Sequence, residues 1–129
     1  GSASNDMANL MGEARQTLLL QRVSQGADAM SAYEALQIAT RGGADVLGRP
    51  DCGRLAPGKR ADLAIWDVSG VASSGSWDPA ALLLAGPSQV KHLFVEGRQI
   101  VQDGHVTTLD LPRLLERHHG LAKRLISGE

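Results

Sequence analysis

Apolar side chains recur three or four positions apart in three stretches of the chain, and this spacing predicts three amphipathic helices. Positions three and four apart lie on one side of a helix, so each helix has a single face to bury. The predicted helices cover residues 7–22, 32–46 and 111–126. Two of them precede the predicted strands and one follows them.

Short polar residues mark where these helices begin, because their side chains accept hydrogen bonds from the free amides of a first helical turn. Asn5 or Asp6 is placed to cap the first helix. Ser31 and Glu34 have the spacing of a capping box at the start of the second. Asp110 is expected to cap the third.

Two glycines lie inside the second predicted helix, which ends at Gly48-Arg49-Pro50. Glycine in a helix interior is unfavourable by roughly 1 kcal/mol relative to alanine. Gly42 and Gly43 are therefore expected to mark a place where another part of the backbone approaches the helix closely.

The spacing changes after residue 50 and predicts a small number of strands. Residues 61–68 form a short, mostly apolar strand that follows the turn-forming segment 53–60. Residues 90–95 and 98–102 flank Glu96-Gly97 and predict a hairpin. The predicted order is thus helix, helix, strand, hairpin, helix, with segment 73–76 as a surface loop. A strand that is apolar on both faces must be covered by other elements, and this sequence predicts too few strands to do so. We therefore expect the further strands to lie in chain outside this sequence.

Composition narrows the choice of function. The 129 residues fit one domain, with 43% hydrophobic and 21% charged residues. The formal net charge is −1, which argues against a nucleic-acid partner. Cys52 is the single cysteine, so no intramolecular disulfide forms and a reducing, cytoplasmic location is expected, with an inert thiol favoured over a reactive one. The longest apolar run, residues 80–85, is too short to span a membrane, so no membrane partner is expected.

Three motifs together resemble one known family. Residues 53–63 read G-x-L-x-P-G-K-x-A-D-L, and Val95-Glu96-Gly97-Arg98 is followed by Asp103-Gly104. Residues 39–48 match the pattern A-T-x-G-x-A-x-x-L-G. In this order and spacing they resemble the C-terminal part of the amidohydrolase superfamily. The resemblance is to its deaminase and chlorohydrolase branch, which includes 8-oxoguanine deaminases and triazine hydrolases.

The resemblance implies an α/β fold made of two parts of a larger enzyme. Residues 1–50 would be the last βα loop and last helices of a (β/α)8 TIM-type barrel. Residues 51–110 would be the C-terminal part of an accessory β-sandwich, and residues 111–129 a C-terminal helix. The earlier barrel strands, with the histidines that bind zinc or iron in the parent enzyme, would lie outside this sequence.

The first six residues, Gly-Ser-Ala-Ser-Asn-Asp, resemble the stretch that follows the metal-facing aspartate of these enzymes. That acid is then expected immediately before Gly1, so no catalytic residue is assigned within the chain. Ser2, Ser4 and Asn5 would belong to the substrate-pocket loop, because active sites of such barrels are built from βα loops. Capping of the first helix by Ser4 and Asn5 is an equally good interpretation, and both roles are compatible.

The remaining polar residues do not suggest a site of their own. His92, His105, His118 and His119 form neither His-x-His nor His-Glu-x-x-His, and adjacent residues on a helix point about 100° apart. No metal ligand is therefore assigned. Asp62 and Asp67 lie on opposite faces of a strand, so a structural role is favoured. We expect Asp62 to hold the turn at residues 57–60.

The hypothesis is that this chain is the C-terminal segment of a metal-dependent hydrolase of C–N bonds, whose parent deaminates a purine-like or triazine ring and releases ammonia. Alone it would be inactive and would hold no cofactor. Its expected partners are the missing N-terminal barrel portion and a second copy in a homo-oligomer, with the heterocycle as substrate of the parent. Two alternatives stay open: a noncatalytic β-sandwich interaction module, and a subunit that completes an active site on another chain.

Overall fold

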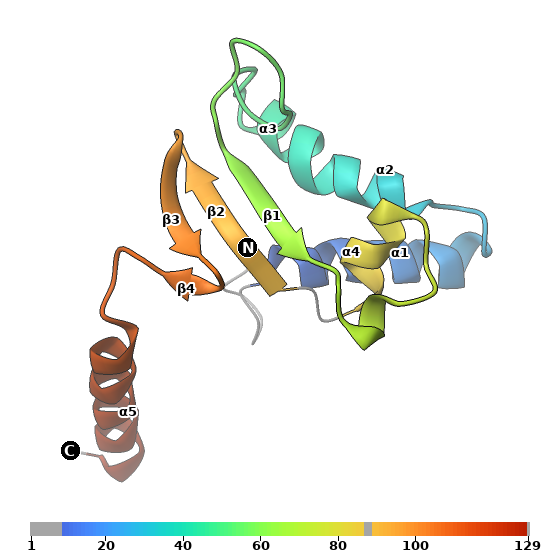
Figure 1. Cartoon of the computed structure of the whole chain (residues 1–129). Coiled ribbons are helices and arrows are strands. Elements are labelled where there is room, and N and C mark those ends of the chain that lie inside the picture. Colours follow the sequence, from blue (N-terminus) through green and yellow to red (C-terminus); the bar gives the residue numbers. More distant parts are fainter. Residues whose placement is uncertain (1–8, 87–88, 129) are drawn as a thin grey trace.

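The computed structural model describes residues 9–86 and 89–128 as a mixed α/β structure with a small antiparallel sheet and helices beside it (Figure 1). The elements are, in order, α1 (Leu10–Gln25), α2 (Ala32–Gln37), α3 (Gly43–Val46), β1 (Leu63–Asp67), α4 (Pro79–Ala85), β2 (Gln89–Val95), β3 (Arg98–Gln102), β4 (His105–Val106) and α5 (Leu111–Ser127). The three predicted helical regions, the strand and the hairpin are confirmed, while α4 and β4 were missed.

Helix α1 begins and ends later than the sequence predicts. Its N-cap is Asn9, whose Oδ1 accepts from the amides of Met11 and Gly12, each at 3.1 Å. The prediction of Asn5 or Asp6 as the cap is therefore wrong, because a third short polar residue with the same capping ability lies one position before Leu10. The helix continues to Gln25 and ends at Gly26, which has a φ of 109°.

The second helical region has the predicted capping box. Ser31 Oγ accepts from the amide of Glu34 at 3.2 Å, and a Glu34 carboxylate oxygen accepts from the amide of Ser31 at 2.7 Å. The pKa of Glu34 is lowered by two hydrogen bonds that its carboxylate accepts. The larger effect comes from the Ser31 backbone amide and the smaller one from the Ser31 hydroxyl. A π-helical turn, Ile38–Gly42, joins α2 to α3, so the three segments run as one continuous rod.

The predicted close approach at the helix glycines is wrong. A Cβ built on Gly43 would meet nothing within 4 Å, and one on Gly42 would meet only the Gln37 carbonyl, at 3.6 Å. Gly53 makes the close approach instead: a Cβ there would lie 2.8 Å from the Ala44 Cβ and 3.1 Å from the Arg41 Cα. The loop after α3 thus folds back onto the helix at Gly53, where no side chain intervenes.

The hydrophobic core lies among three helices. Ala14 and Leu18 of α1, Ala32 and Ala35 of α2, and Leu84 of α4 form one buried cluster. Alanine dominates the cluster, so the helix axes lie close together and little apolar area is buried per contact. No residue of the sheet belongs to the cluster.

The four strands are antiparallel in the order β1-β2-β3-β4. Glu96 and Gly97 have φ values of 51° and 77°, as a two-residue type I′ hairpin requires. Asp103 and Gly104 repeat this geometry with φ values of 48° and 78° and produce β4. Two residues of strand are too few for a periodic pattern, which is why β4 escaped prediction.

Helix α4 was not predicted from the sequence for a related reason. Its apolar run, residues 80–85, has no polar position that would show a helical period. The local signals were nevertheless present, because Asp78 Oδ1 accepts from the Ala80 amide at 2.9 Å and Pro79 occupies the first turn. None of the helices in the described ranges is long and apolar enough to cross a membrane.

The chain exposes more surface than a compact protein of its size. Its accessible surface is 9868 Å². A compact monomer of 13.6 kDa is expected to expose about 6,600 Å². Within the described residues, only Ala14, Leu18, Ala32, Ala35, Ala44 and Leu84 are buried apolar residues. Much apolar surface therefore stays uncovered in this chain by itself.

The approach of Gly53 to the helix makes a sharp stability prediction. Alanine at this position must adopt the left-handed φ of 78° and also displace Ala44. We expect Gly53→Ala to lower the free energy of unfolding by about 2–4 kcal/mol, as the sum of backbone strain and overpacking. Gly58→Ala is the matched control, since Gly58 has a φ of 79° but a Cβ there would meet nothing within 4 Å. It should lose about 1 kcal/mol, and equal losses in urea unfolding would contradict the close approach.

Candidate functional site

The residues that the sequence predicts for the substrate pocket lie outside the described part of the chain. Ser2, Ser4 and Asn5 precede residue 9, so their assignment to the pocket loop stays a prediction. The polar chemistry that the structure describes lies elsewhere, in the loop between α3 and β1.

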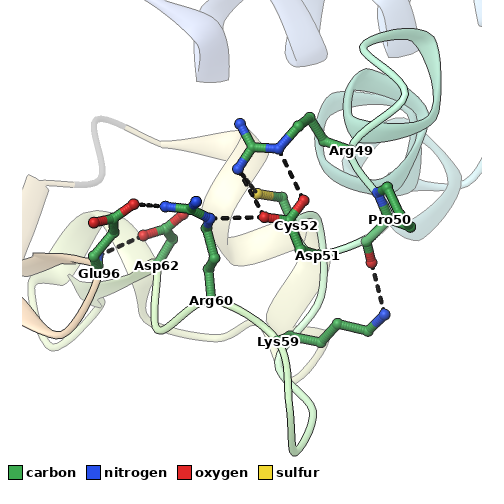
Figure 2. Close-up of polar contacts among 8 residues, drawn as sticks. All are labelled: Arg49, Pro50, Asp51, Cys52, Lys59, Arg60, Asp62 and Glu96. Atoms are coloured by element: carbon green, nitrogen blue, oxygen red, sulfur yellow. Dashed lines mark hydrogen bonds and ion pairs between the residues drawn. The ribbon is translucent and has the colours of Figure 1, made fainter.

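A cluster of charged side chains surrounds Asp51 in this loop (Figure 2). Arg49 binds the Asp51 carboxylate with two atoms, Nε to Oδ1 and Nη2 to Oδ2, both at 2.8 Å. Arg60 Nε donates to the same Oδ2 at 2.7 Å, and the Arg60 amide donates to the Asp51 carbonyl at 2.9 Å. Lys59 Nζ donates to the carbonyl of Pro50 at 2.6 Å. Asp51 thereby ties the end of α3 to the segment that enters β1.

The cluster continues to the β2–β3 turn, as Figure 2 shows. Arg60 also pairs with the carboxylate of Glu96. Asp62 Oδ1 accepts from the Glu96 amide at 2.7 Å, and the Gly97 amide donates to the Ala61 carbonyl at 3.0 Å. The prediction that Asp62 holds the turn at residues 57–60 is therefore wrong, because pairing of β1 with β2 brings the hairpin turn beside it. Asp62 instead holds Glu96 in its left-handed conformation.

The charges in this cluster favour the ionised carboxylate of Asp51. Hydrogen bonds from Arg49, and then from Arg60, hold the pKa of Asp51 well below its usual range. Asp51 in turn raises the pKa of the Arg49 guanidinium. Arg49 Nη2 also donates to Cys52 Sγ at 3.2 Å, and Cys52 is half-buried. All of these groups have protein partners, so the cluster acts as a structural clamp that fixes the loop.

Asp67, at the other end of β1, also has a structural partner. Its Oδ1 accepts from the Ser69 hydroxyl at 2.6 Å and from the Ser69 amide at 2.9 Å. These bonds, with the hydroxyl first, lower the pKa of Asp67. The expected structural role of Asp67 is confirmed.

The four histidines lie apart from the clamp. Half-buried His92 accepts from the Asp103 amide through Nδ1 at 3.3 Å, and His105 Nδ1 lies 2.8 Å from the Asp103 carbonyl. Both therefore support the β3–β4 turn. The rings of His118 and His119 on α5 are 6.2 Å apart and tilted by 50°.

The described residues do not fit a catalytic metal. A hydrolytic zinc site takes about three protein ligands plus an open position. Residues 9–86 and 89–128 contain no group of three or more His, Cys, Asp or Glu side chains that could hold an ion. These described residues therefore do not form a catalytic metal site among themselves.

An apolar groove of about 430 Å³ lies between the start of α1, the middle of the α2–α3 rod and β1. Leu10, Leu36, Leu63, Trp66 and Leu83 are among the residues that line it, together with the polar side chains of Arg54 and Asp62. Its lining comes from both the helices and β1, so the groove lies where the helical part meets the sheet.

Comparison with known proteins shows which protein family this chain is related to. A protein-family model described as the amidohydrolase family matches residues 1–100. The chain belongs to the amidohydrolase family. The family resemblance predicted from the motifs is thus confirmed, and those motifs that lie within residues 1–100 fall inside the match.

Individual amidohydrolase relatives agree along almost the whole chain. The 8-oxoguanine deaminase of Pseudomonas aeruginosa is 49% identical over 129 residues, which cover 99% of this chain and 29% of that protein. The atrazine chlorohydrolase of Arthrobacter aurescens TC1, crystallised with zinc, has a TM-score of 0.85 and 39% identity and covers 94% of this chain. An adenosine deaminase from Xanthomonas campestris with bound zinc has a TM-score of 0.89 and 28% identity and covers 98% of this chain.

The amidohydrolase relatives are much longer than this chain. The chain spans 29% of the P. aeruginosa enzyme, 28% of the A. aurescens enzyme and 30% of the X. campestris enzyme. This chain therefore corresponds to less than one third of the length of each of these enzymes.

The ionised state of Asp51 predicts how stability depends on pH. Because its pKa is lower in the folded chain than the ordinary value of 3.8, its stabilising effect is complete above that value and is lost as the pH falls below it. We expect Asp51→Asn to unfold at a lower temperature than the wild-type chain at pH 7, with a difference that shrinks below pH ~4. The exposed Asp28, in the loop after α1, supplies the control variant Asp28→Asn. Thermal unfolding from pH 7 to pH 3 tests this, and a difference that stays constant would contradict the clamp.

Proposed function

We propose that this chain is the C-terminal segment of a metal-dependent deaminase whose substrate is a purine-like heterocycle, with 8-oxoguanine preferred over a triazine. The observation that carries the proposal is the 49% identity to 8-oxoguanine deaminase, which extends over 99% of the chain. The 5-methylthioadenosine/S-adenosylhomocysteine deaminase of Desulfitobacterium hafniense matches the same length at 33%. The reaction would replace a ring amino group by oxygen from water and release ammonia.

The segment is proposed to be inactive without the rest of the enzyme. The described residues offer no set of three metal ligands, so those ligands would come from the part of the enzyme that this chain does not span. The accessible surface of 9868 Å² exceeds that of a compact protein of this size, which supports a segment that is covered by further chain. We divide it as residues 1–50 at the end of the barrel, 51–110 in the β-sandwich and 111–129 as the terminal helix.

Ser2, Ser4 and Asn5 are proposed to contact the ring or to orient the acid that precedes them. The support is the sequence likeness to the last βα loop of the family, since such loops build the active sites of (β/α)8 barrels. These residues would be positioning groups with hydroxyl and amide hydrogen bonds.

A graft tests the proposal directly. The chain replaces the matching 29% of the P. aeruginosa 8-oxoguanine deaminase, and ammonia release is measured with 8-oxoguanine, 5-methylthioadenosine and a chlorotriazine. We expect the graft to restore deamination of 8-oxoguanine, while the truncated enzyme without the segment stays inactive. A folded, metal-loaded graft without turnover on any of the rings would contradict the proposal.

The same graft separates the pocket loop from the fold. Ser4→Ala should lower kcat/KM by about 10-fold or more, as the loss of one hydrogen bond that strengthens in the transition state. Ser24→Ala is the matched control, because Ser24 lies at the exposed end of α1 and its hydroxyl donates to the Gln21 carbonyl of the same helix at 3.2 Å. Equal rates for both variants would remove Ser4 from the site.

A further inference from the structure

Helix α5 presents a continuous apolar stripe that this chain leaves uncovered. Leu111, Leu114, Leu115, Leu121, Leu125 and Ile126 form the stripe. The spacing of three and four residues puts these side chains on one side of the helix, with His118 among them. Their exposed fractions run from 42% for Leu111 to 88% for Ile126.

The opposite side of α5 is charged and suited to water. Arg113, Arg117, Lys123 and Arg124 lie there with Glu116. None of the residues of α5 is buried, and only Ala122 is even partly so. A helix with one apolar and one strongly polar side is stabilised in water chiefly by burial of the apolar side. The stripe therefore needs a surface to cover it.

The helix stands away from the rest of the chain (Figure 1). It follows β4 after a short connection and lies beyond the end of the family match at residue 100. The comparison with the X. campestris adenosine deaminase nevertheless covers 98% of this chain, so it includes α5. In that relative, the equivalent arrangement occurs inside a chain of which this segment is 30%.

We propose that the α5 stripe packs into an apolar groove on the remaining, N-terminal part of the same enzyme, and so fastens the sheet to the barrel. The inference rests on the proposed function, because it needs that part to exist. It goes further by assigning the contact to one helix face. The length of the relatives supports this occupant, since about 70% of each lies outside the matched segment.

A second copy of the chain suits the stripe less well. Helix α5 has 17 residues and is about 25 Å long, so six side chains along it form only a narrow contact. Stable complexes bury roughly 800 Å² per partner and must also offset the lost translational freedom of two molecules. A surface within the same polypeptide carries no such cost, and a narrow stripe is then sufficient.

Hydrogen exchange of the α5 amides tests the assignment, measured in the isolated 129-residue chain and in the graft with the P. aeruginosa enzyme. We expect rapid exchange in the isolated chain and at least 100-fold slower exchange in the graft, independent of protein concentration. Leu114→Gln together with Leu121→Gln should restore rapid exchange, whereas Arg113→Gln on the polar side should not. Sedimentation of the isolated chain should show no association that depends on Leu114 and Leu121.

The outcomes separate this inference from the proposed function. A graft that deaminates 8-oxoguanine while α5 exchanges as fast as in the isolated chain would overturn the helix assignment alone. A graft with a protected α5 but no deamination would leave the helix assignment standing and overturn the proposed function. Concentration-dependent association of the isolated chain that the two leucine substitutions abolish would identify a second copy as the occupant and overturn the assignment, whether or not the graft folds.

Discussion

The pairing of Asp51 with Arg49 and Arg60 fixes the loop between α3 and β1, the segment that connects the helical part of the chain to the sheet. Among the described residues, the buried apolar cluster joins the helices α1, α2 and α4, and an apolar groove lies between these helices and the sheet. The loop between α3 and β1 bridges that gap: Gly53 lies against the helix, and Arg60 reaches from Asp51 to Glu96 of the hairpin turn. Exposed ion pairs are individually weak, so the clamp owes its effect to the two arginines that share the Asp51 carboxylate together with the Arg60–Glu96 pair and the neighbouring backbone bonds.

A clamp of this kind suits a segment that is completed by further chain. Three of the five residues in the helical cluster are alanines, and the sheet contributes nothing to it. Such a core gives little hydrophobic stabilisation for 129 residues, since stabilisation scales with the apolar area removed from water. The accessible surface of 9868 Å² also indicates that little apolar area is removed from water in this chain. Membership of the amidohydrolase family, with relatives about three times longer, supplies the physical explanation.

Local sequence signals predicted most of the fold, and the misses have identifiable causes. The capping box at Ser31, the Glu96-Gly97 turn and the cap at Asp110 each depend on neighbouring residues, and all three are confirmed. The partners of Asp62 and Gly53 depend on segments about 34 and 9 positions away, which no local pattern reveals. The motif that contains Gly53 and Asp62 did carry the family resemblance. The sequence nevertheless predicted the wrong partner for Asp62, which binds the β2–β3 turn at Glu96 and not the turn at residues 57–60. Ser2, Ser4 and Asn5 remain predictions because they lie outside the described residues.

The isolated chain offers the most direct test of whether this segment depends on the rest of the enzyme for its metal and its activity. Its metal content is measured together with ammonia release from 8-oxoguanine in the same sample, after its mass and its folded state have been established. We expect a folded chain without stoichiometric transition metal and without turnover, because the described residues supply no set of three metal ligands. One equivalent of bound metal with ammonia release would contradict it, and would mean that this segment carries a complete active site of its own.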